Sequence, residues 1–374
     1  MKKLGIYLHI PFCVQKCLYC DFCSFPRAER ELMSSYADAL CRDIQGYGER
    51  CGEYSVDTVY FGGGTPTLLP IKEFEKIMKS LTDSFKIEKK AEISSECNPA
   101  TADGDYLRAL RDIGLNRLSI GLQSANENEL RALGRIHTYR DFLETYESAR
   151  AAGFENISAD LMYGIPEQTL SSFEHTLSEL VSLAPEHISA YGLKVEEETP
   201  FGKMKNTLVL PDEDIEYEMY MRCTNYLCEN GYDKYEISNF SRMGYESRHN
   251  IKYWKGDDYL GFGVSAHSYF EGERFANSRD IKGYISGIDI CGERQRICDD
   301  ERMTEYVMLH MRMAAGVEYS DFERSFGVDF ESVYGDKLER YVRSGHVIKN
   351  RERTAFSDKG FFVSNFILSD ILEF

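Results

Sequence analysis

Short runs rich in β-branched and aromatic residues alternate with longer segments of helical periodicity through the first half of the chain. The runs occupy residues 4–10, 56–61, 91–97, 117–121, 156–162 and 187–193. Between the first two runs, apolar side chains recur at the spacing of one helix face: Leu32, Tyr36, Leu40, Ile44 and Tyr47. Strands that alternate with amphipathic helices in this way are typical of βαβ units around a parallel sheet.

Six strand–helix repeats are too few to close an eight-stranded barrel. The pattern therefore predicts an α/β fold built on a partial (β/α)6 barrel that stays open along one side. In parallel barrels, ligands and reacting groups gather at the carboxyl ends of the strands. Polar side chains that follow each predicted strand are accordingly the first candidates for a functional site.

The pattern changes near residue 198, and we expect three parts: a barrel over 1–198, an accessory region over 199–298 and a C-terminal domain over 299–374. The accessory region is rich in Tyr and Gly and predicts one helix, over 212–229, followed by irregular strands and loops.

The C-terminal part is helical, with a hairpin pattern at residues 346–356 before a last helix. Helices followed by a small hairpin predict a smaller α+β region that is winged-helix-like.

Charge, cysteine content and hydropathy limit the kinds of partner and the cellular location that we expect. The 374 residues carry a formal net charge of −18, which argues against a nucleic-acid partner, because such a partner needs a basic face. The 11 cysteines form no regular framework, so we expect free thiols in a reducing compartment. No apolar run reaches the roughly 18 residues of a transmembrane helix, and no signal-peptide cleavage site is evident. We therefore expect a cytoplasmic protein.

The most informative motif is HIPFCVQKCLYC, which sets Cys13, Cys17 and Cys20 in a C-x3-C-x2-C triplet directly after the first predicted strand. Three thiolates on one loop can hold three irons of a 4Fe–4S cube and leave the fourth iron open to a small molecule. A zinc site and chance are the alternatives. Structural zinc usually needs a second ligand pair farther along the chain, and no CxxC or HxxxH partner appears.

The same motif resembles that of the radical S-adenosylmethionine (SAM) superfamily. YLHIPFC followed by KCLYCDF is similar to the branch that contains oxygen-independent coproporphyrinogen III oxidase and the HemW-type heme chaperones. The resemblance implies a partial barrel, a 4Fe–4S cluster ligated by Cys13, Cys17 and Cys20, and SAM on the open iron, where reduction cleaves it to a 5′-deoxyadenosyl radical.

The resemblance also implies a set of SAM-binding residues. A glycine turn at residues 62–66 follows the second strand; alone it is a tight βα turn, and the family gives it contact with the SAM amino group. Single polar residues near later strand ends would ordinarily be solvated or bonded to backbone. The positions implied to contact or flank SAM are Tyr7, Tyr19, Gly63, Gly64, Thr65, Glu96, Gln123, Arg135 and Asp160. Whether one or two SAM molecules bind stays open.

Two departures favour the HemW-type group over the oxidases. The oxidases carry a fourth cysteine in the pattern C-x3-C-x2-C-x-C, whereas here Phe22 holds that position and Cys23 follows it. A fourth thiolate would close the iron that SAM needs, so we expect Cys23 not to be a cluster ligand. The first cysteine also lies close to the start of the chain, without the longer N-terminal segment expected of the oxidases.

The run HNIKYW, residues 249–254, matches a motif of the HemW-type chaperones and contains the single Trp. A neutral imidazole is a good axial ligand for heme iron, and Tyr and Trp offer flat faces to a porphyrin. The resemblance therefore implies heme contact by His249, Tyr253 and Trp254. His267 lies nearby in the Gly- and aromatic-rich run GVSAHSYF and is a secondary candidate. Without the resemblance, a hydrogen-bonded histidine with no ligand role is the simpler interpretation of His249.

From these features we expect a heme chaperone that binds a 4Fe–4S cluster, SAM and heme, and delivers heme to client apo-hemoproteins. The first alternative is oxygen-independent coproporphyrinogen III oxidase, which decarboxylates propionate side chains oxidatively. The second is a related radical SAM methyltransferase that modifies heme. Turnover of coproporphyrinogen under anaerobic conditions separates the chaperone from the oxidase.

Overall fold

The fold is described from a computed structural model that covers residues 1–288, 290–292 and 294–373. Its centre is a twelve-stranded sheet in the order β14-β13-β12-β11-β1-β4-β5-β6-β7-β8-β10-β9. The six strands predicted from the sequence are its consecutive parallel core. They are β1 (Lys2–Ile10), β4 (Tyr54–Gly63), β5 (Ile87–Cys97), β6 (Arg117–Gln123), β7 (Ile157–Tyr163) and β8 (His187–Gly192). The predicted α/β partial barrel is confirmed.

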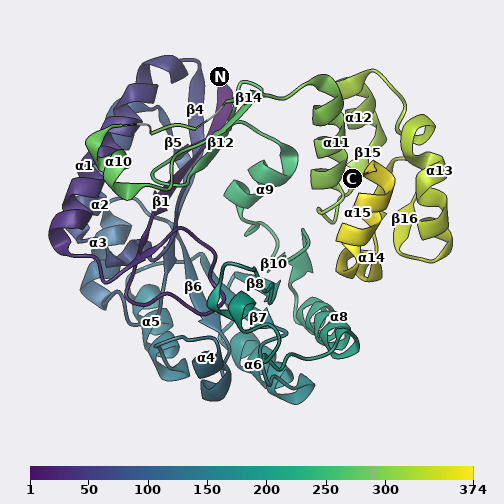
Figure 1. Cartoon of the computed structure of the whole chain (residues 1–374), viewed down its shortest axis with the longest axis horizontal. Coiled ribbons are helices and arrows are strands. Elements are labelled where there is room, and N and C mark those ends of the chain that lie inside the picture. Colours follow the sequence, from purple (N-terminus) through teal and green to yellow (C-terminus); the bar gives the residue numbers. More distant parts are fainter. Residues whose placement is uncertain (289, 293, 374) are drawn as a thin grey trace.

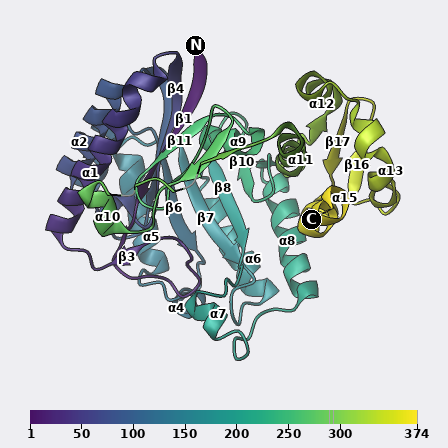
Figure 2. The ribbon, with the colours of Figure 1, turned by 45° about the horizontal axis from the view of Figure 1, so that its top comes forward.

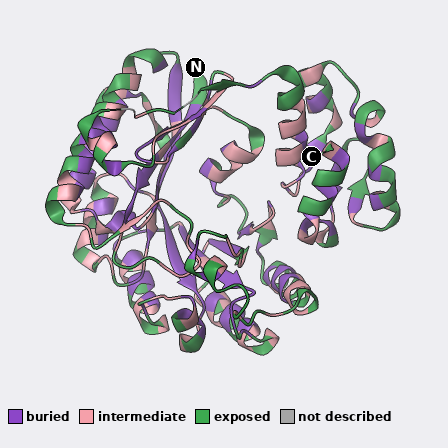
Figure 3. Ribbon diagram, viewed as in Figure 1, coloured by how far each residue is buried: buried purple, intermediate pink, exposed green. Residues whose placement is uncertain are grey.

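Helices cover the outer, convex face of this sheet, while its inner face curves around the middle of the molecule (Figure 1). The outer helices are α1 (Arg30–Gly48), α2 (Ile71–Ser84), α3 (Gly104–Asp112), α4 (Glu127–Ala132), α5 (Tyr139–Ala151) and α6 (Leu170–Ser182). Local sequence sets their starts: Thr138 and Thr169 each cap a helix by accepting a backbone N–H bond from its first turn. The buried residues form a band between helices and sheet (Figure 3).

The region after the barrel extends the sheet at both edges. On one side, β11 (Tyr259–Phe262) pairs in parallel with β1. Beyond it follow the antiparallel strands β12 (His267–Phe270), β13 (Glu273–Ala276) and β14 (Gln295–Arg296). On the other side, β10 (Asn239–Ser241) pairs antiparallel with β8, and β9 (Asp233–Lys234) pairs antiparallel with β10 at the sheet edge. The division into parts at 198 and 298 stays a prediction.

Helix α9 (Arg248–Lys255) carries the HNIKYW motif, where the sequence predicted only strands and loops. Ser247 caps its N-terminus, and Gly256 ends it in the left-handed conformation with φ 64°. Sequence periodicity did not reveal α9 or the short α10 (Ile281–Ser286), because both helices are too short to show a clear period. Figure 1 shows α9 on the inner side of the sheet.

The C-terminal part has the predicted helices and hairpin. It contains α11 (Asp299–His310), α12 (Tyr319–Phe326), α13 (Phe330–Arg343), α14 (Asp358–Phe362) and α15 (Ser364–Leu372). A three-stranded sheet is made by β15 (Val317–Glu318), β17 (Arg353–Phe356) and β16 (Val347–Lys349).

This part lies beside the open side of the barrel (Figure 2). There α11 packs on α9, and α14 packs on α8 (Glu213–Glu229). The ion pair of Lys234 with Asp358, 2.8 Å long, ties β9 to α14. Among the described residues, no helix is both long and apolar enough to cross a membrane.

Candidate functional site

A cavity of about 500 Å³ opens at the carboxyl ends of the parallel strands. It gathers side chains from the cysteine loop and from successive strand ends, as the barrel argument predicts. Eleven of the fifteen predicted site residues line it: Cys13, Cys17, Tyr19, Cys20, Gly63, Gly64, Thr65, Glu96, Gln123, Arg135 and Asp160. The other four, Tyr7, His249, Tyr253 and Trp254, lie elsewhere.

The cysteine loop is closed by pairing between its two flanks and is tied to the barrel at its middle. Its flanks form a short parallel pair, β2 (Phe12–Cys13) with β3 (Phe25–Pro26). In between, the Leu18 N–H donates to the carbonyl of Leu133 at 3.0 Å. These bonds position Cys13, Cys17 and Cys20, each partly exposed and unpaired, at the mouth of the cavity.

Two of the cysteine sulfurs are joined by a continuous path of hydrogen bonds. The Thr65 hydroxyl donates to Cys13 Sγ at 3.8 Å, and Asn98 Nδ2 donates to Thr65 Oγ1 at 2.7 Å. Arg135 then donates to Asn98 Oδ1 at 2.9 Å and to Cys17 Sγ at 3.5 Å. Because donors at a cluster's sulfurs stabilise negative charge there, this path suits a thiolate-ligated group.

The thiols also fit a cluster by their chemistry. Burial raises the pKa of Cys13, and it raises the pKa of Cys20 to about 11, so both are neutral thiols until cations displace their protons. Among the described residues, no three His, Cys, Asp or Glu side chains converge as ligands for a single metal ion. Three thiols around one cavity provide the donor set of a three-cysteine cube, for which Cys13, Cys17 and Cys20 are the residues present.

Backbone conformation and close packing explain why glycine stands at positions 63 and 64 of the turn. Gly63 has φ 112°, which glycine adopts without strain. A Cβ on Gly64 would lie 2.6 Å from the carbonyl oxygen of Phe12, the residue before the first cysteine. Glycine at 64 therefore lets β4 and the cysteine strand approach closely, which brings Thr65 within reach of Cys13.

Two carboxylates face the cavity from β5 and β7, the strands on either side of β6. Glu96 Oε2 accepts the Gly63 N–H at 3.0 Å, and Oε1 accepts the Tyr60 hydroxyl at 3.2 Å. Burial, together with the negative charge of Asp160, raises the pKa of Glu96 to about 7. Asp160 accepts from the Ser119 hydroxyl at 3.0 Å, and burial raises its pKa as well. A cationic ligand in the cavity would be attracted to both groups.

Gln123 and Arg135 meet where the β6 ladder is irregular. Gln123 is buried in the left-handed conformation, with φ 67°, at a register shift between β6 and β7. Strain of this kind costs of order 1–3 kcal/mol and clusters at ligand sites. Arg135 also donates to the Gly121 carbonyl at 3.1 Å, so the bulge fixes its guanidinium beside the cysteine loop.

Sequence reasoning missed several lining residues. Arg117 opens β6, is 2 % exposed, and has a buried Nε with no hydrogen-bond partner among the described residues. In the sequence, Arg117 could have been noticed as a charged residue at the edge of an apolar strand. Asn98, which completes the path between two sulfurs, gave no local signal. Asn250 lies in the HNIKYW motif, but sequence reasoning assigned it no role.

The structure places His249 in the core rather than in a cavity. Its side chain is fully buried, Nδ1 is bonded to the Thr58 hydroxyl at 2.8 Å and Nε2 to the Tyr253 hydroxyl at 2.8 Å. Burial, with the charges of Lys252 and Arg117, lowers its pKa to about 3. Both nitrogens are thus occupied, and an iron ligand would have to displace one of these bonds. The heme contact predicted for this residue stays a prediction.

The motif as a whole anchors α9 inside the barrel. The backbone N–H groups of Arg248 and His249 both donate to Glu92 of β5 at 3.1 Å. Lys252, buried, pairs with Asp57 of β4 at 2.9 Å. Trp254 interacts through its side chain with buried Glu236. Helix α9 therefore closes the inner side of the sheet.

Tyr7 lines a second cavity, of about 380 Å³, with Cys23, Tyr253 and His267. It is bonded to His9 Nδ1 at 3.0 Å and stacks on Tyr60, with ring centroids 6.3 Å apart. Its predicted place beside SAM stays a prediction. Cys23 lines this second cavity and not the three-cysteine cavity, and its predicted lack of a ligand role stays a prediction as well.

Sequence comparison shows which known protein families this chain resembles. Residues 7–180 match the radical SAM superfamily, and residues 298–363 match the HemN C-terminal domain. The chain is 34% identical to the heme chaperone HemW of Bacillus subtilis, over 98% of each chain. The chain belongs to the HemW family. HemW proteins of Lactococcus lactis and Escherichia coli are 32% and 30% identical, covering 99% and 98% of this chain and the same shares of their own.

The fold has a solved counterpart outside the HemW family. Coproporphyrinogen III oxidase from Escherichia coli, a radical SAM enzyme, superposes with a TM-score of 0.87, over 99% of this chain and 90% of its own. Its identity to this chain is 24%, so the likeness establishes the fold. The shared fold covers both the open barrel and the C-terminal helices of this chain.

Proposed function

We propose that this protein is a heme chaperone: it holds a 4Fe–4S cluster, binds SAM at the open iron, binds heme and passes it to client apo-hemoproteins. The curated relatives of near-equal length are heme chaperones by name, which supports the heme role. The cytoplasmic location expected from composition is part of this proposal.

The proposed binding of the cluster and SAM is supported mainly by the hydrogen-bond path from Cys13 through Thr65, Asn98 and Arg135 to Cys17. It joins two cysteine positions to two predicted SAM positions within one cavity of about 500 Å³. That volume is in the range of about 300–1,000 Å³ typical of small-molecule sites. Glu96, Gln123, Arg135 and Asp160 would hold SAM there, beside Gly63 and Thr65.

The deciding experiment is anaerobic reconstitution with iron and sulfide, followed by separate assays with hemin and with coproporphyrinogen III. We expect near-stoichiometric hemin binding, transfer of heme to an apo-hemoprotein, and no protoporphyrinogen IX. Steady decarboxylation in the presence of SAM and reductant, with hemin binding absent, would establish the oxidase instead.

Single alanine variants of Glu96, Gln123, Arg135 and Asp160 should fold and weaken SAM binding. Each loses a hydrogen bond to a charged ligand, about 1.5–3 kcal/mol, or roughly ten- to a hundred-fold in affinity. Titration calorimetry on the reconstituted protein measures the change. Arg140→Ala, at an exposed arginine of α5, is the matched control and should bind SAM normally. Unchanged affinity in all four variants would remove these residues from the site.

SAM affinity should also depend on pH through Glu96. Its pKa of about 7 in the free protein lies above the ordinary value of 4.5, so near neutral pH part of the population carries a proton. A bound cation favours the carboxylate, so binding releases that proton, and affinity should fall by up to tenfold per pH unit below about 7. Above about pH 7 this dependence should level off. Glu96→Gln should flatten the profile; an unchanged slope would assign the dependence to another group.

A further inference from the structure

The second cavity lies on the other side of the residues that follow the last cluster cysteine. Its volume is about 380 Å³, and Asp21, Phe22 and Cys23 form one wall. Phe22 is 63% exposed at its rim, an unusual placement for a large apolar side chain. The cavity is thus open to solvent and carries apolar surface at its edge.

One imidazole in this cavity has free nitrogens. His267 begins β12, is exposed, and has no hydrogen-bond or ion-pair partner among the described residues. The other histidine of the lining, His9, is fully engaged: Nδ1 is bonded to the Tyr7 hydroxyl at 3.0 Å and Nε2 to the Cys23 carbonyl at 2.8 Å. His267 is therefore the histidine there that can bind a metal without breaking an existing bond.

The backbone of His267 is held in place by its neighbour strand. A Cβ on Gly261 of β11 would collide with the carbonyl oxygen of His267, so glycine there permits a close contact between the two strands. On the other side, His267 pairs with Ala276 of β13. The imidazole thus projects from a fixed strand position.

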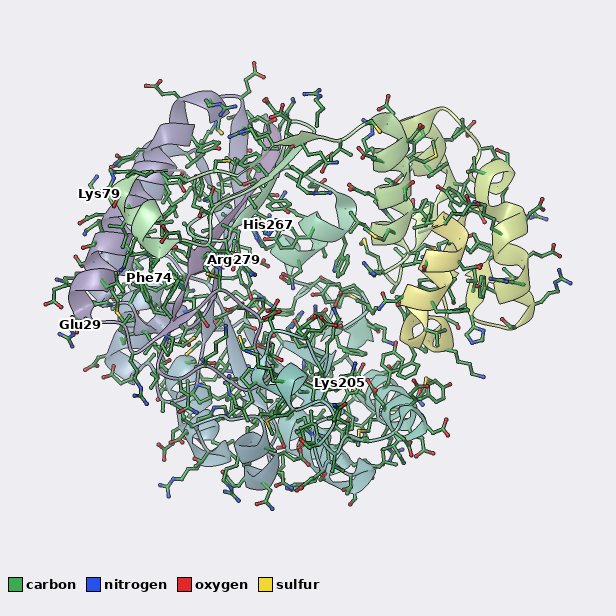
Figure 4. All side chains as sticks on the ribbon, viewed as in Figure 1. Glu29, Phe74, Lys79, Lys205, His267 and Arg279 are labelled. Carbon is green, nitrogen blue, oxygen red and sulfur yellow. The ribbon has the colours of Figure 1, made fainter. Side chains whose placement is uncertain are left out.

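A cation stands beside this imidazole. Arg279 is exposed, lines the same cavity and makes no ion pair among the described residues. Figure 4 places both side chains near the middle of the molecule. Although the residue is exposed overall, partial burial of its ring, with the charges of Arg274 and Arg279, lowers the pKa of His267, so the ring is neutral at neutral pH. A free guanidinium at a rim suits a carboxylate ligand.

Aromatic rings complete the lining. Tyr253 and Tyr259 meet edge to face, with ring centroids 4.6 Å apart, and Tyr7 lies in the same cavity. Burial raises the pKa of all three, so they remain neutral phenols whose rings offer packing surface rather than phenolate ligands.

We propose that this cavity is the heme seat, in which a His267 nitrogen ligates the iron, Arg279 pairs with a propionate, and Tyr253 and Tyr259 contact the macrocycle. The inference rests on the proposed function and names its site. The imidazole donates a lone pair to the iron in place of a water molecule, and no electron is transferred. An open seat with a single protein ligand also suits a chaperone, because the client can reach the exposed edge of the heme.

The test is titration of the full-length protein with hemin and with iron-free protoporphyrin IX, followed by absorbance and fluorescence. The wild-type protein should bind hemin more tightly, since the iron adds a bond to His267. His267→Ala should move the Soret maximum, weaken hemin binding roughly tenfold or more, and leave protoporphyrin IX binding unchanged. Arg279→Gln should weaken both porphyrins alike. His175→Ala, at an exposed histidine of α6, is the matched control and should behave as wild type.

The outcomes separate this inference from the proposed function. A wild-type protein that binds no hemin would overturn both. Hemin binding that is equal in His267→Ala and His175→Ala would leave the chaperone function standing and overturn the seat. If His267→Ala binds hemin more weakly than wild type but binds protoporphyrin IX equally well, the proposed heme seat is supported.

Discussion

Replacing Cys13, Cys17 or Cys20 by alanine should abolish the 4Fe–4S absorption of the reconstituted protein. A cube held by three thiolates loses a third of its protein ligands with one substitution. Among the described residues that line the cavity, the one further thiol is that of Cys97, which is buried. Iron and sulfide analysis with the electron paramagnetic resonance spectrum measures the loss.

Cys23→Ala provides the internal comparison for the cluster. Because Cys23 lies in the second cavity, its variant should retain about four irons and four sulfides, the stoichiometry of the cube. Cys228→Ala, at an exposed cysteine of α8, should do the same. A cluster that survives Cys20→Ala but is lost in Cys23→Ala would show that the ligand assignment is wrong.

Replacing His249 by alanine should destabilise the fold strongly. The ring is fully buried, stacks on Tyr60 at 5.3 Å and satisfies the hydroxyls of Thr58 and Tyr253. Its removal leaves a cavity and two buried hydroxyls without partners, which together should lower the free energy of unfolding by about 3–5 kcal/mol. Urea denaturation of the cluster-free protein, followed by circular dichroism, gives this value.

The same variant also tests the ligand role predicted from HNIKYW. His175→Ala, the exposed control, should unfold at the wild-type urea concentration. If His249→Ala matches that control in stability while losing hemin binding, then His249 is an iron ligand and the buried hydrogen bonds seen here give way when heme binds. Strong destabilisation with the hemin spectrum retained would assign the histidine to the core.

Local pattern determined a large part of the fold. The six parallel strands lie where the apolar runs predicted them, and the hairpin at 346–356 appears as β16 and β17. The reason is that period-2 and period-3.6 patterns record which face of each element is buried. The three cysteines proposed as cluster ligands were also evident, because residues on one short loop are brought together by local chain geometry alone.

What the sequence could not determine is which polar groups face each other across the fold. Nothing near Asn98 distinguishes it from a surface residue. Asn98 becomes informative only when β5 and the loop after α4 bring it between Thr65 and Arg135. The two histidines show the same limit. The sequence favoured His249 as a heme contact over His267, but α9 packs the first among Thr58, Tyr60 and Tyr253, while β12 leaves the second exposed. Whether an imidazole nitrogen is free to bind a ligand depends on residues far away in the chain. Burial and hydrogen bonding across the sheet, and not residue type, therefore decide which histidine can reach a ligand.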